Sequence, residues 1–393
     1  MQRSSERIIT THVGSLPRPI DLARVLQDKD NGLPYDGSTL PAKVKQSISD
    51  VVAKQVELGV DVVNDGEHSK SSFAAYTAQR LSGFEPVDKH FGFAGKKSRD
   101  IMEFGPVYEE NQAMFGVRPS RLLMTRRHQV YACAGPLRYR GHEEVKTDIE
   151  NLRASMRASG GLEGFITALS PLIMSWFHPN QYYKSDEEYR TALADAMREE
   201  YKIIIDSGFI LQIDDPRIAA YYDRHPEKSL QECRAVMQEQ IEVINYALRG
   251  LPEERIRFHT CYAINVAPRA HDLELKDYVD LLLTIRAGGY SFEAANPRHE
   301  HEWQVWEEVK LPDDKVIIPG VVSHCVQLVE HPELVAQRIE RFARAVGRER
   351  VLASNDCGFA TAGAHDEVHP LVAWAKTKSL VDGARIASKR LWN

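Results

Sequence analysis

The sequence predicts an α/β protein built as a (β/α)8 TIM barrel, and three observations lead to this prediction. Short apolar, β-branched runs alternate with longer amphipathic stretches along the 393 residues. The longer stretches carry apolar residues three and four positions apart, as expected of helices with one buried face. Polar residues gather directly after most of the short runs, as they do at the active face of such barrels. Repeated strand–helix alternation favours parallel pairing and, most economically, a closed barrel.

The eight expected strands are short and spread over the whole chain. They are expected at residues 8–15, 61–65, 165–170, 209–214, 257–261, 290–293, 316–322 and 351–356. A chain of this length fills a single barrel with insertions, so we expect one domain over residues 1–393.

The main helices are expected at residues 40–58, 186–207, 229–251, 273–287 and 332–346. Ser185 precedes three acidic residues, and Ser229 is followed three positions later by Glu232. Both serines are therefore expected to cap helices, the second within a capping box. Three glycines follow helices at positions where a left-handed residue is expected, and these are Gly59, Gly208 and Gly288.

A large insertion, at about residues 83–160, interrupts the alternation after the second strand. Residues 91–105 and 131–133 are expected to form an antiparallel hairpin, followed by a helix over residues 143–158. An insertion of this size on a barrel loop usually serves as a lid or a subunit contact. We therefore expect a lid, or a homo-oligomer formed through the insertion.

Composition argues against several classes of partner. The formal net charge is -6 and the pI about 6.2, and no stripe of Lys and Arg interleaved with aromatic residues is present, so nucleic acid is not expected. The sequence contains no run of 18 apolar residues and no apolar stretch at its N-terminus, so we expect no membrane and a cytoplasmic protein. Five scattered cysteines favour reduced thiols or metal ligands over disulfides.

Four residues at or just beyond strand ends form a candidate zinc site: His259, Cys261, Glu293 and Cys357. Successive side chains alternate faces in a strand, so His259 and Cys261 point the same way. One imidazole, two thiolates and one carboxylate suit Zn²⁺ better than Mg²⁺ or Ca²⁺. The alternative is that each cysteine is a small buried apolar residue. The gathering of polar residues after the other strands favours zinc.

Five motifs, kept in order, carry a resemblance to a known family. They are Thr-His-Val-Gly-Ser-Leu-Pro-Arg-Pro at residues 11–19, Ile-Asp-Asp-Pro at 213–216, His259-x-Cys261, Glu293, and Asp-Cys-Gly at 356–358. Together they resemble the catalytic half of cobalamin-independent methionine synthase. The resemblance implies a barrel that holds zinc through one His, two Cys and one Glu. It also implies transfer of the methyl group of methyltetrahydrofolate, or of another donor, to the zinc-bound sulfur of homocysteine.

The resemblance assigns roles to further residues one by one. Ser15 matches a serine that contacts the amino-acid substrate through its backbone. Glu67 and Asp214 match two carboxylates that hold the substrate ammonium, with a solvated loop as the alternative. His324 matches the histidine taken as the proton donor to the leaving group, with a surface histidine as the alternative. The implied partners are a small-molecule thiol and an alkyl donor, with a folate as one candidate donor.

The sequence also departs from the family. Long methionine synthases carry a second, N-terminal barrel and have Asp-Glu-Pro where this chain has Asp214-Asp215-Pro216. Trp176 lies one residue away from the position of the family's folate-stacking tryptophan, with packing in the core or a lid as its alternative role. Arg18 is the nearest basic candidate for a substrate anion.

The single-barrel format resembles a short branch that also contains epoxyalkane:coenzyme M transferases. Four functions therefore stay open at this point. They are methyl or alkyl transfer to a thiol, an epoxyalkane-type or other C–S bond-forming or bond-cleaving reaction, a metal-free decarboxylase of the uroporphyrinogen type, and a catalytically silent zinc-stabilised scaffold. The four candidate ligands argue against the decarboxylase, and the carboxylates Glu67 and Asp214 argue against the scaffold. They also favour an amino-acid thiol, since a sulfonate thiol would prefer Arg or Lys there.

Overall fold

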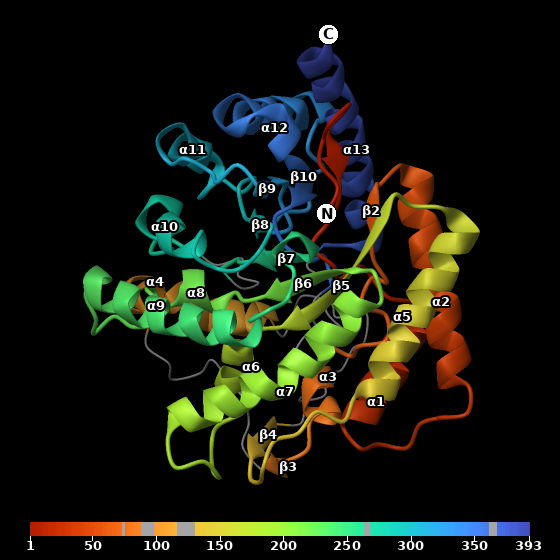
Figure 1. The fold of residues 1–393 in the computed structure, drawn as a ribbon, viewed down its shortest axis with the longest axis vertical. Coiled ribbons are helices and arrows are strands. Elements are labelled where there is room, and N and C mark those ends of the chain that lie inside the picture. Colours follow the sequence, from red (N-terminus) through yellow and green to blue (C-terminus); the bar gives the residue numbers. More distant parts are fainter. Residues whose placement is uncertain (73–74, 88–97, 116–129, 263–267, 361–367) are drawn as a thin grey trace.

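The computed structural model describes residues 1–72, 75–87, 98–115, 130–262, 268–360 and 368–393. Eight parallel strands form one sheet in the order β1-β10-β9-β8-β7-β6-β5-β2, with the helices outside it (Figure 1). The predicted barrel class is confirmed. The strands are β1 (Ile9–Thr10), β2 (Val62–Val63), β5 (Glu163–Leu169), β6 (Ile210–Asp214), β7 (Ile256–His259), β8 (Gly289–Phe292), β9 (Val316–Val322) and β10 (Leu352–Asn355).

A side chain bridges the first two strands, which stand at the two ends of the strand order. The Asp61 Oδ2 atom accepts hydrogen bonds from the Thr10 amide at 2.8 Å and the Thr10 hydroxyl at 2.9 Å. Arg7 donates to both oxygens of the same carboxylate, at 2.7 and 2.6 Å. The Asp61 amide in turn donates to the Thr10 carbonyl at 3.2 Å. These bonds tie β1 to the residue that precedes β2, and so connect the two ends of the strand order.

The helices are α1 (Ile20–Asp30), α2 (Leu40–Leu58), α3 (Ala75–Arg80), α4 (Arg99–Phe115), α5 (His142–Ser159), α6 (Pro171–Phe177), α7 (Asp186–Asp206), α8 (Arg217–Ala220), α9 (Leu230–Ala247), α10 (Val279–Leu282), α11 (Val305–Glu308), α12 (Pro332–Val346) and α13 (Pro370–Trp392). Both predicted serine caps are present. The Ser185 hydroxyl accepts the Glu188 amide, and Ser229 and Glu232 form the capping box.

Two of the three glycine predictions are confirmed, because Gly59 and Gly208 have φ angles of 94° and 91°. The prediction for Gly288 is wrong. This glycine is not among the left-handed residues of the described chain, and it permits a close approach instead. A Cβ atom at Gly288 would lie 2.8 Å from the Glu253 carbonyl oxygen.

The predicted helix over residues 273–287 is also wrong. A 3₁₀ turn at Leu275–Asp277 and the single-turn helix α10 occupy this segment. At the start of this segment, two backbone groups bond to side chains from other parts of the chain. The Glu302 carboxylate accepts the Leu275 amide at 2.8 Å, and the Tyr262 hydroxyl donates to the Leu273 carbonyl at 2.5 Å. The apolar spacing is correct, but the backbone of Tyr278, with φ -146° and ψ 1°, is not helical and separates the two turns.

The insertion contains the predicted antiparallel pair, formed by β3 (Phe84–Val87) and β4 (Val130–Cys133). This pair lies at the bottom of Figure 1.

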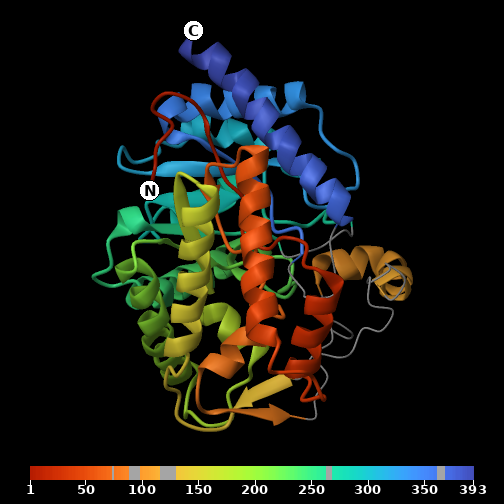
Figure 2. The same ribbon diagram turned by 90° about the vertical axis from the view of Figure 1, so that its right-hand side faces the viewer.

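The strand β3 lies before residues 91–105, where the first strand of the hairpin was expected. Residues 91–97 lie outside the described part of the chain. Residues 99–105 belong instead to α4, which stands out from the body of the molecule in Figure 2. Its backbone is non-helical at Phe104, two residues before Pro106, as expected for proline inside a helix. The predicted helix over 143–158 is present as α5, which packs on α2 and α7.

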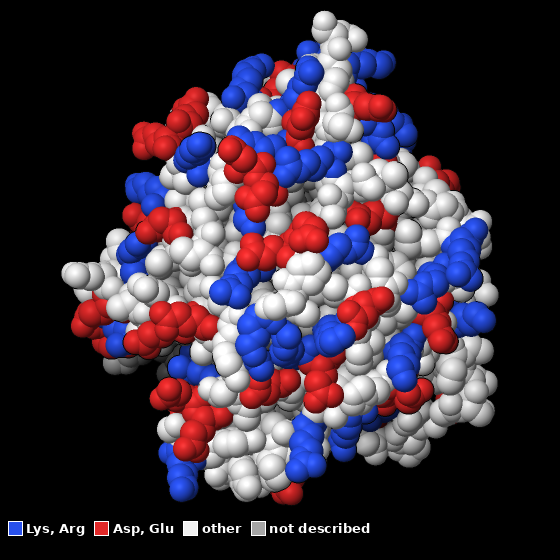
Figure 3. Space-filling view, in the orientation of Figure 1, with Lys and Arg blue, Asp and Glu red and all other residues white. Residues whose placement is uncertain are grey.

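The surface carries charges of both signs. Lys and Arg side chains are interspersed with Asp and Glu side chains over the face shown in Figure 3. Within the described residues, the structure contains no helix whose length and apolar character would allow it to span a bilayer.

Candidate metal centre

His259, Cys261 and Cys357 meet at the mouth of the barrel. β7 ends at His259, and Cys357 follows the last residue of β10 by two positions. One ligand atom from each residue lies within 4.8 Å of the others, and all three are buried. The two sulfur atoms are 3.7 Å apart, against about 2.05 Å in a disulfide. The pair of thiols and the imidazole therefore have the spacing of ligands around one ion.

The imidazole of His259 supplies a test of whether a metal fits. Its Nδ1 atom bonds to the Ser291 hydroxyl at 3.2 Å, whereas its Nε2 atom is buried without a hydrogen-bond partner. Burial lowers the pKa of His259 to about 3, so the ring is neutral at neutral pH. A buried nitrogen without a partner is costly, and a metal ion would satisfy it. These three residues fit Zn²⁺.

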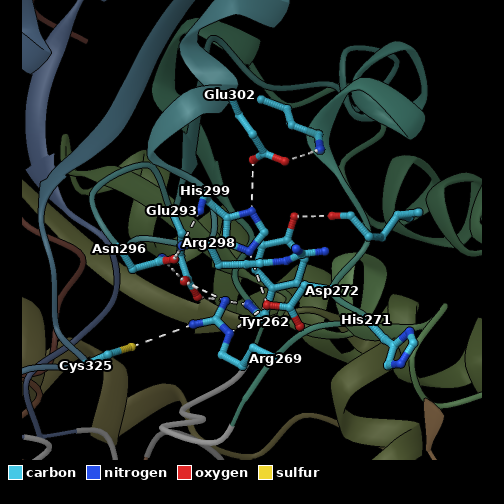
Figure 4. A network of polar contacts seen from close by, with 12 residues as sticks. Tyr262, Arg269, His271, Asp272, Glu293, Asn296, Arg298, His299, Glu302 and Cys325 are labelled. Carbon is cyan, nitrogen blue, oxygen red and sulfur yellow. Dashed lines mark hydrogen bonds and ion pairs between the residues drawn. The ribbon is translucent and has the colours of Figure 1, made fainter. Parts of the chain in front are cut away.

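Glu293, the fourth predicted ligand, lies in a neighbouring group with His324 and Asp356. Its Oε1 atom accepts the Tyr262 amide at 3.0 Å, and its Oε2 atom accepts Arg269 Nη2 at 2.9 Å and Asn296 Nδ2 at 2.8 Å. Figure 4 shows these bonds. Burial alone would raise the pKa of Glu293, but the charge of Arg269, the nearby His324 and His299, and the hydrogen bond from the Tyr262 amide together lower the pKa to about 2. The carboxylate is ionised, and both of its oxygen atoms accept hydrogen bonds.

The sequence prediction omitted Arg269 and Asn296. Asn296 also donates to Asp356 Oδ2 at 3.2 Å, while Asp356 Oδ1 accepts the amides of Ala294 and Ala295 at 2.8 and 2.9 Å. The signal for Asn296 was its position, three residues after Glu293 at the end of a strand. Arg269 lies beyond the strand end, and no spacing rule points to it.

The predicted ammonium-binding residues Glu67 and Asp214 line one small pocket that has no room for a water molecule in this structure, together with Lys70, Tyr76, Thr167, Ala168 and Leu169. Burial raises the pKa of Asp214 well above its usual value, and the charge of Glu67 raises it further. Glu67 has a φ angle of 60°, and its Oε2 atom is buried without a hydrogen-bond partner. The Oε1 atom accepts the Thr167 hydroxyl at 3.0 Å. The pocket therefore presents one carboxylate oxygen ready for a donor.

Lys70, which the sequence prediction also omitted, brings a positive charge to this pocket. Its ammonium group donates to the Thr167 carbonyl at 2.7 Å and the Thr167 hydroxyl at 3.0 Å. It also lies 4.3 Å from the centre of the Tyr76 ring. Lys70 is three residues after Glu67, and that spacing gave no sign that the two share a pocket.

The other predicted substrate residues are placed as follows. Ser15 has a buried hydroxyl without a hydrogen-bond partner. Arg18 donates from Nε and Nη2 to the Glu67 carbonyl and from Nη1 to the Ala360 carbonyl, so it holds the backbone of Glu67. Trp176 is half-buried on α6, with the Arg224 guanidinium 4.5 Å from its ring centre.

His324, the predicted proton donor, is fully buried one residue beyond the loop start at Ser323. Its Nε2 atom lies 3.3 Å from the Cys325 sulfur. Burial lowers the pKa of His324 to about 4. His324 thus stands on the same face as the three candidate metal ligands, in the group that contains Glu293.

Known proteins resemble this chain over nearly its whole length. The family model described as the catalytic domain of cobalamin-independent synthase matches residues 8–102 and 140–377. Methionine synthases of Saccharolobus solfataricus and Thermococcus kodakarensis are each 23% identical, over 385 and 387 residues. The alignments cover 97% of this chain in both cases, and 95% and 94% of the relatives.

Solved structures show the same fold. A B12-independent methionine synthase from Shewanella sp. W3-18-1, in complex with selenomethionine, superposes with a TM-score of 0.71 at 20% identity, covering 98% of this chain and 99% of that one. A putative vitamin-B12-independent methionine synthase from Listeria monocytogenes gives a TM-score of 0.64 at 18% identity, with 97% and 98% coverage. Since the family model matches far more than half of the residues, the chain belongs to the cobalamin-independent methionine synthase family.

Proposed function

We propose that this protein is a zinc-dependent methyltransferase that transfers a methyl group to the sulfur of homocysteine. The observation that carries the proposal is the buried, unpartnered Nε2 atom of His259 beside the thiols of Cys261 and Cys357. Zinc bound there would lower the pKa of a coordinated substrate thiol and keep its sulfur nucleophilic near neutral pH. The family and the methionine synthase relatives support the same reaction class.

The chain's own residues would bind and orient the two substrates. The free Oε2 atom of Glu67, with Asp214 beside it, would accept the homocysteine ammonium, and the Ser15 turn would contact its carboxylate end. The sulfur then forms a bond to the methyl carbon while the bond from that carbon to its leaving atom breaks. The leaving atom keeps the electron pair and must gain a proton, which His324 would supply in its protonated form, a minor species at neutral pH because its pKa is about 4. Trp176, in its half-buried position, is the candidate surface for a folate donor.

Lys70 supports a second candidate function. Its ammonium group already places a cation in the pocket that would receive the substrate ammonium. A thiol that carries an anionic group and no ammonium would find Lys70 favourable, as in an epoxyalkane:coenzyme M transferase-like reaction, where the thiolate opens an epoxide. Three clustered sulfur and imidazole donors argue against the metal-free decarboxylase.

One experiment separates these candidates. Cobalt-substituted protein is titrated with homocysteine and with 2-mercaptoethanesulfonate, and the absorption of the metal reports which sulfur enters its coordination sphere. Methyl transfer is then measured with methyltetrahydrofolate, and ring opening with a short epoxide. We expect homocysteine to shift the spectrum and to be methylated. A response only to the sulfonate thiol, lost in Lys70→Met, would favour the second function. Protein that binds no metal would refute both.

A further inference from the structure

We propose that Arg257 and Gln212 position the Asp214 carboxylate for the ammonium group of the acceptor thiol. The same pair holds residues 11–13, which lead into the turn that carries Ser15. Neither Arg257 nor Gln212 would touch the substrate, so both are positioning residues. This inference rests on the acceptor pocket of the proposed function, and it names the side chains that set the preference of that pocket for an amino-acid thiol.

Gln212 and Arg257 lie inside the barrel, one layer below the candidate site. They pair across the neighbouring strands β6 and β7 (Figure 1). Two residues further along the same strands, Asp214 pairs with His259. The exposed fractions of Gln212 and Arg257 are 0% and 1%. Side chains two residues apart in a strand point the same way, so the two pairs form successive layers of the barrel interior.

The hydrogen bonds of Gln212 fix the orientation of its amide group. Its Oε1 atom accepts Arg257 Nε at 2.6 Å, and a guanidinium can only donate, so this end of the amide must be the oxygen. The Nε2 atom then donates to Asp214 Oδ1 at 2.6 Å and to the Val13 carbonyl at 2.5 Å. Within the described part of the chain, the Asp214 Oδ2 atom accepts no hydrogen bond. Arg257 thus directs the amide donor to one oxygen of Asp214 and leaves the other oxygen for a substrate.

Arg257 also bonds to the segment that follows β1. Its Nη1 atom donates to the Thr11 hydroxyl at 2.9 Å, and its Nη2 atom donates to the His12 carbonyl at 2.6 Å. The strands β10, β9, β8 and β7 lie between β1 and β6 in the order of the sheet, so these bonds run across the barrel interior. Asp214 and the approach to Ser15 are therefore held by the same two side chains.

An apolar layer supports the guanidinium from the side away from the pocket. The Arg257 Cζ atom lies 3.5 Å from the centre of the Phe165 ring, a cation–π contact. Phe165 belongs to a buried apolar cluster that also contains Ile9, Val62, Ile210, Val316, Ile318 and Leu352. The guanidinium thus rests on a packed floor and faces its polar partners above.

The partners of Arg257 distinguish positioning from packing. The three acceptors are an amide oxygen, a hydroxyl and a backbone carbonyl, and none of them is a carboxylate. Burying a guanidinium without a bonded carboxylate is costly, whereas an apolar side chain would fill the same space without that cost. All three acceptors belong to segments that frame the pocket. The guanidinium therefore serves the geometry of the pocket more than the stability of the barrel.

The test compares two thiols that differ by one group. The second thiol, 4-mercaptobutyrate, is homocysteine without its ammonium group, so both carry a thiol and a carboxylate on the same carbon chain. Calorimetric titration of the protein with each thiol gives two dissociation constants, and their ratio measures the preference for the ammonium group. The unmodified protein should prefer homocysteine by roughly ten- to a hundredfold, the range for a charged hydrogen bond.

Two variants should reduce this preference. Gln212→Met keeps the length of the side chain but removes the donor to Asp214, and it should lower the preference about tenfold. Arg257→Lys keeps the positive charge but loses the planar group that bonds to several acceptors at once, so it should change the preference in the same direction. In both variants the loss should come from weaker binding of homocysteine, with the affinity for 4-mercaptobutyrate and the zinc content unchanged.

Arg338→Lys is the matched control. Arg338 is also a buried arginine, with bonds to the Glu300 carboxylate and the Val321 carbonyl, and it lies on α12 outside the barrel. The same exchange there should leave the preference for homocysteine unchanged.

The ratio of the two affinities separates positioning from a purely structural role. An equal loss of affinity for both thiols would overturn the inference, and so would an unchanged preference in the variants or an unmodified protein without any preference. If Gln212→Met does not fold, Arg257→Lys decides. Failure of both variants to fold would assign the pair to stability and would also overturn the inference.

These outcomes differ from those that test the proposed function. A preference that is lost in the variants of a protein without methyl transfer would refute the function and keep the inference. Methyl transfer to homocysteine, with the preference intact in both variants, would keep the function and overturn the inference.

Discussion

The Cys357 thiol lies 3.7 Å from the Cys261 thiol, although 96 residues separate the two cysteines in the chain. The strands that precede them, β7 and β10, are not neighbours, because β8 and β9 lie between them in the sheet. The two thiols therefore meet across the mouth of the barrel. Curvature of the sheet, and not direct pairing of the two strands, brings the thiols together.

We predict one zinc ion per chain, lost in Cys261→Ser and in Cys357→Ser, because each change removes one of three clustered ligands. Elemental analysis after dialysis measures the metal. Cys233→Ala, a buried cysteine on α9, is the control and should keep its zinc. Full zinc occupancy in both serine variants would show that the cluster is not the metal site.

Asp214→Asn should weaken homocysteine binding while zinc content stays normal. The lost charged hydrogen bond is worth on the order of 1.5 to 3 kcal/mol. Calorimetric titration with homocysteine measures the change. Asp215→Asn is the contrast, because Asp215 accepts the amides of Arg217 and Ile218 at the start of α8 and should affect stability more than binding. Unchanged homocysteine affinity in Asp214→Asn would point to a thiol without an ammonium group.

His324→Asn should keep zinc and thiol binding but lose turnover by roughly 10²- to 10⁴-fold, the usual contribution of a general acid. The loss should shrink with a sulfonium donor, whose leaving group needs no proton. Steady-state rates with a folate and a sulfonium donor check this. Intact folate turnover would exclude His324 as the acid. His12 would be a poor replacement, since its ring nitrogens already bond to Gln55 and the Gly14 amide.

Asp30→Asn should stabilise the protein at neutral pH and not at pH 4. Burial raises the pKa of Asp30 to about 6. The hydrogen bond from Gln79 and the charge of Lys29 lower this pKa, but their effect is smaller. The native state therefore binds the proton more tightly than the unfolded chain, and this residue makes the free energy of unfolding fall as pH rises from about 4 to about 6. Asparagine has no such titration, so the variant should gain about 2 to 3 kcal/mol above that window.

Urea unfolding of the unmodified protein and of Asp30→Asn, at pH 4 and pH 7.5, measures the difference between their free energies of unfolding. The contributions of the other titrating groups are the same in both proteins and cancel in this difference. A difference that stays the same at the two pH values would mean that Asp30 is ionised throughout. The site lies far in sequence from the candidate metal ligands, so zinc content provides an independent check that the fold is retained.

The sequence by itself determined the barrel and two helix caps. It also placed His259 and Cys261 near each other, but β7 ends at His259, so strand alternation does not fix the position of Cys261. The barrel and the caps depend on short-range periodicity and on residues within three positions of each other. The Ser229 hydroxyl, for example, accepts a hydrogen bond from the amide of Glu232, only three residues away. Polar residues after parallel strands converge because the barrel collects all such ends at one face.

The tertiary structure alone decided which partner each of these polar groups takes. Glu293 faces Arg269 from a different segment, and Lys70 enters the pocket of Glu67 and Asp214. The segment after Leu273 is not a long helix, because the backbone of the buried Tyr278 is not helical and interrupts it. A buried carboxylate or amide bonds to whichever donor or acceptor packing brings within about 3 Å, and packing joins residues that no local pattern connects.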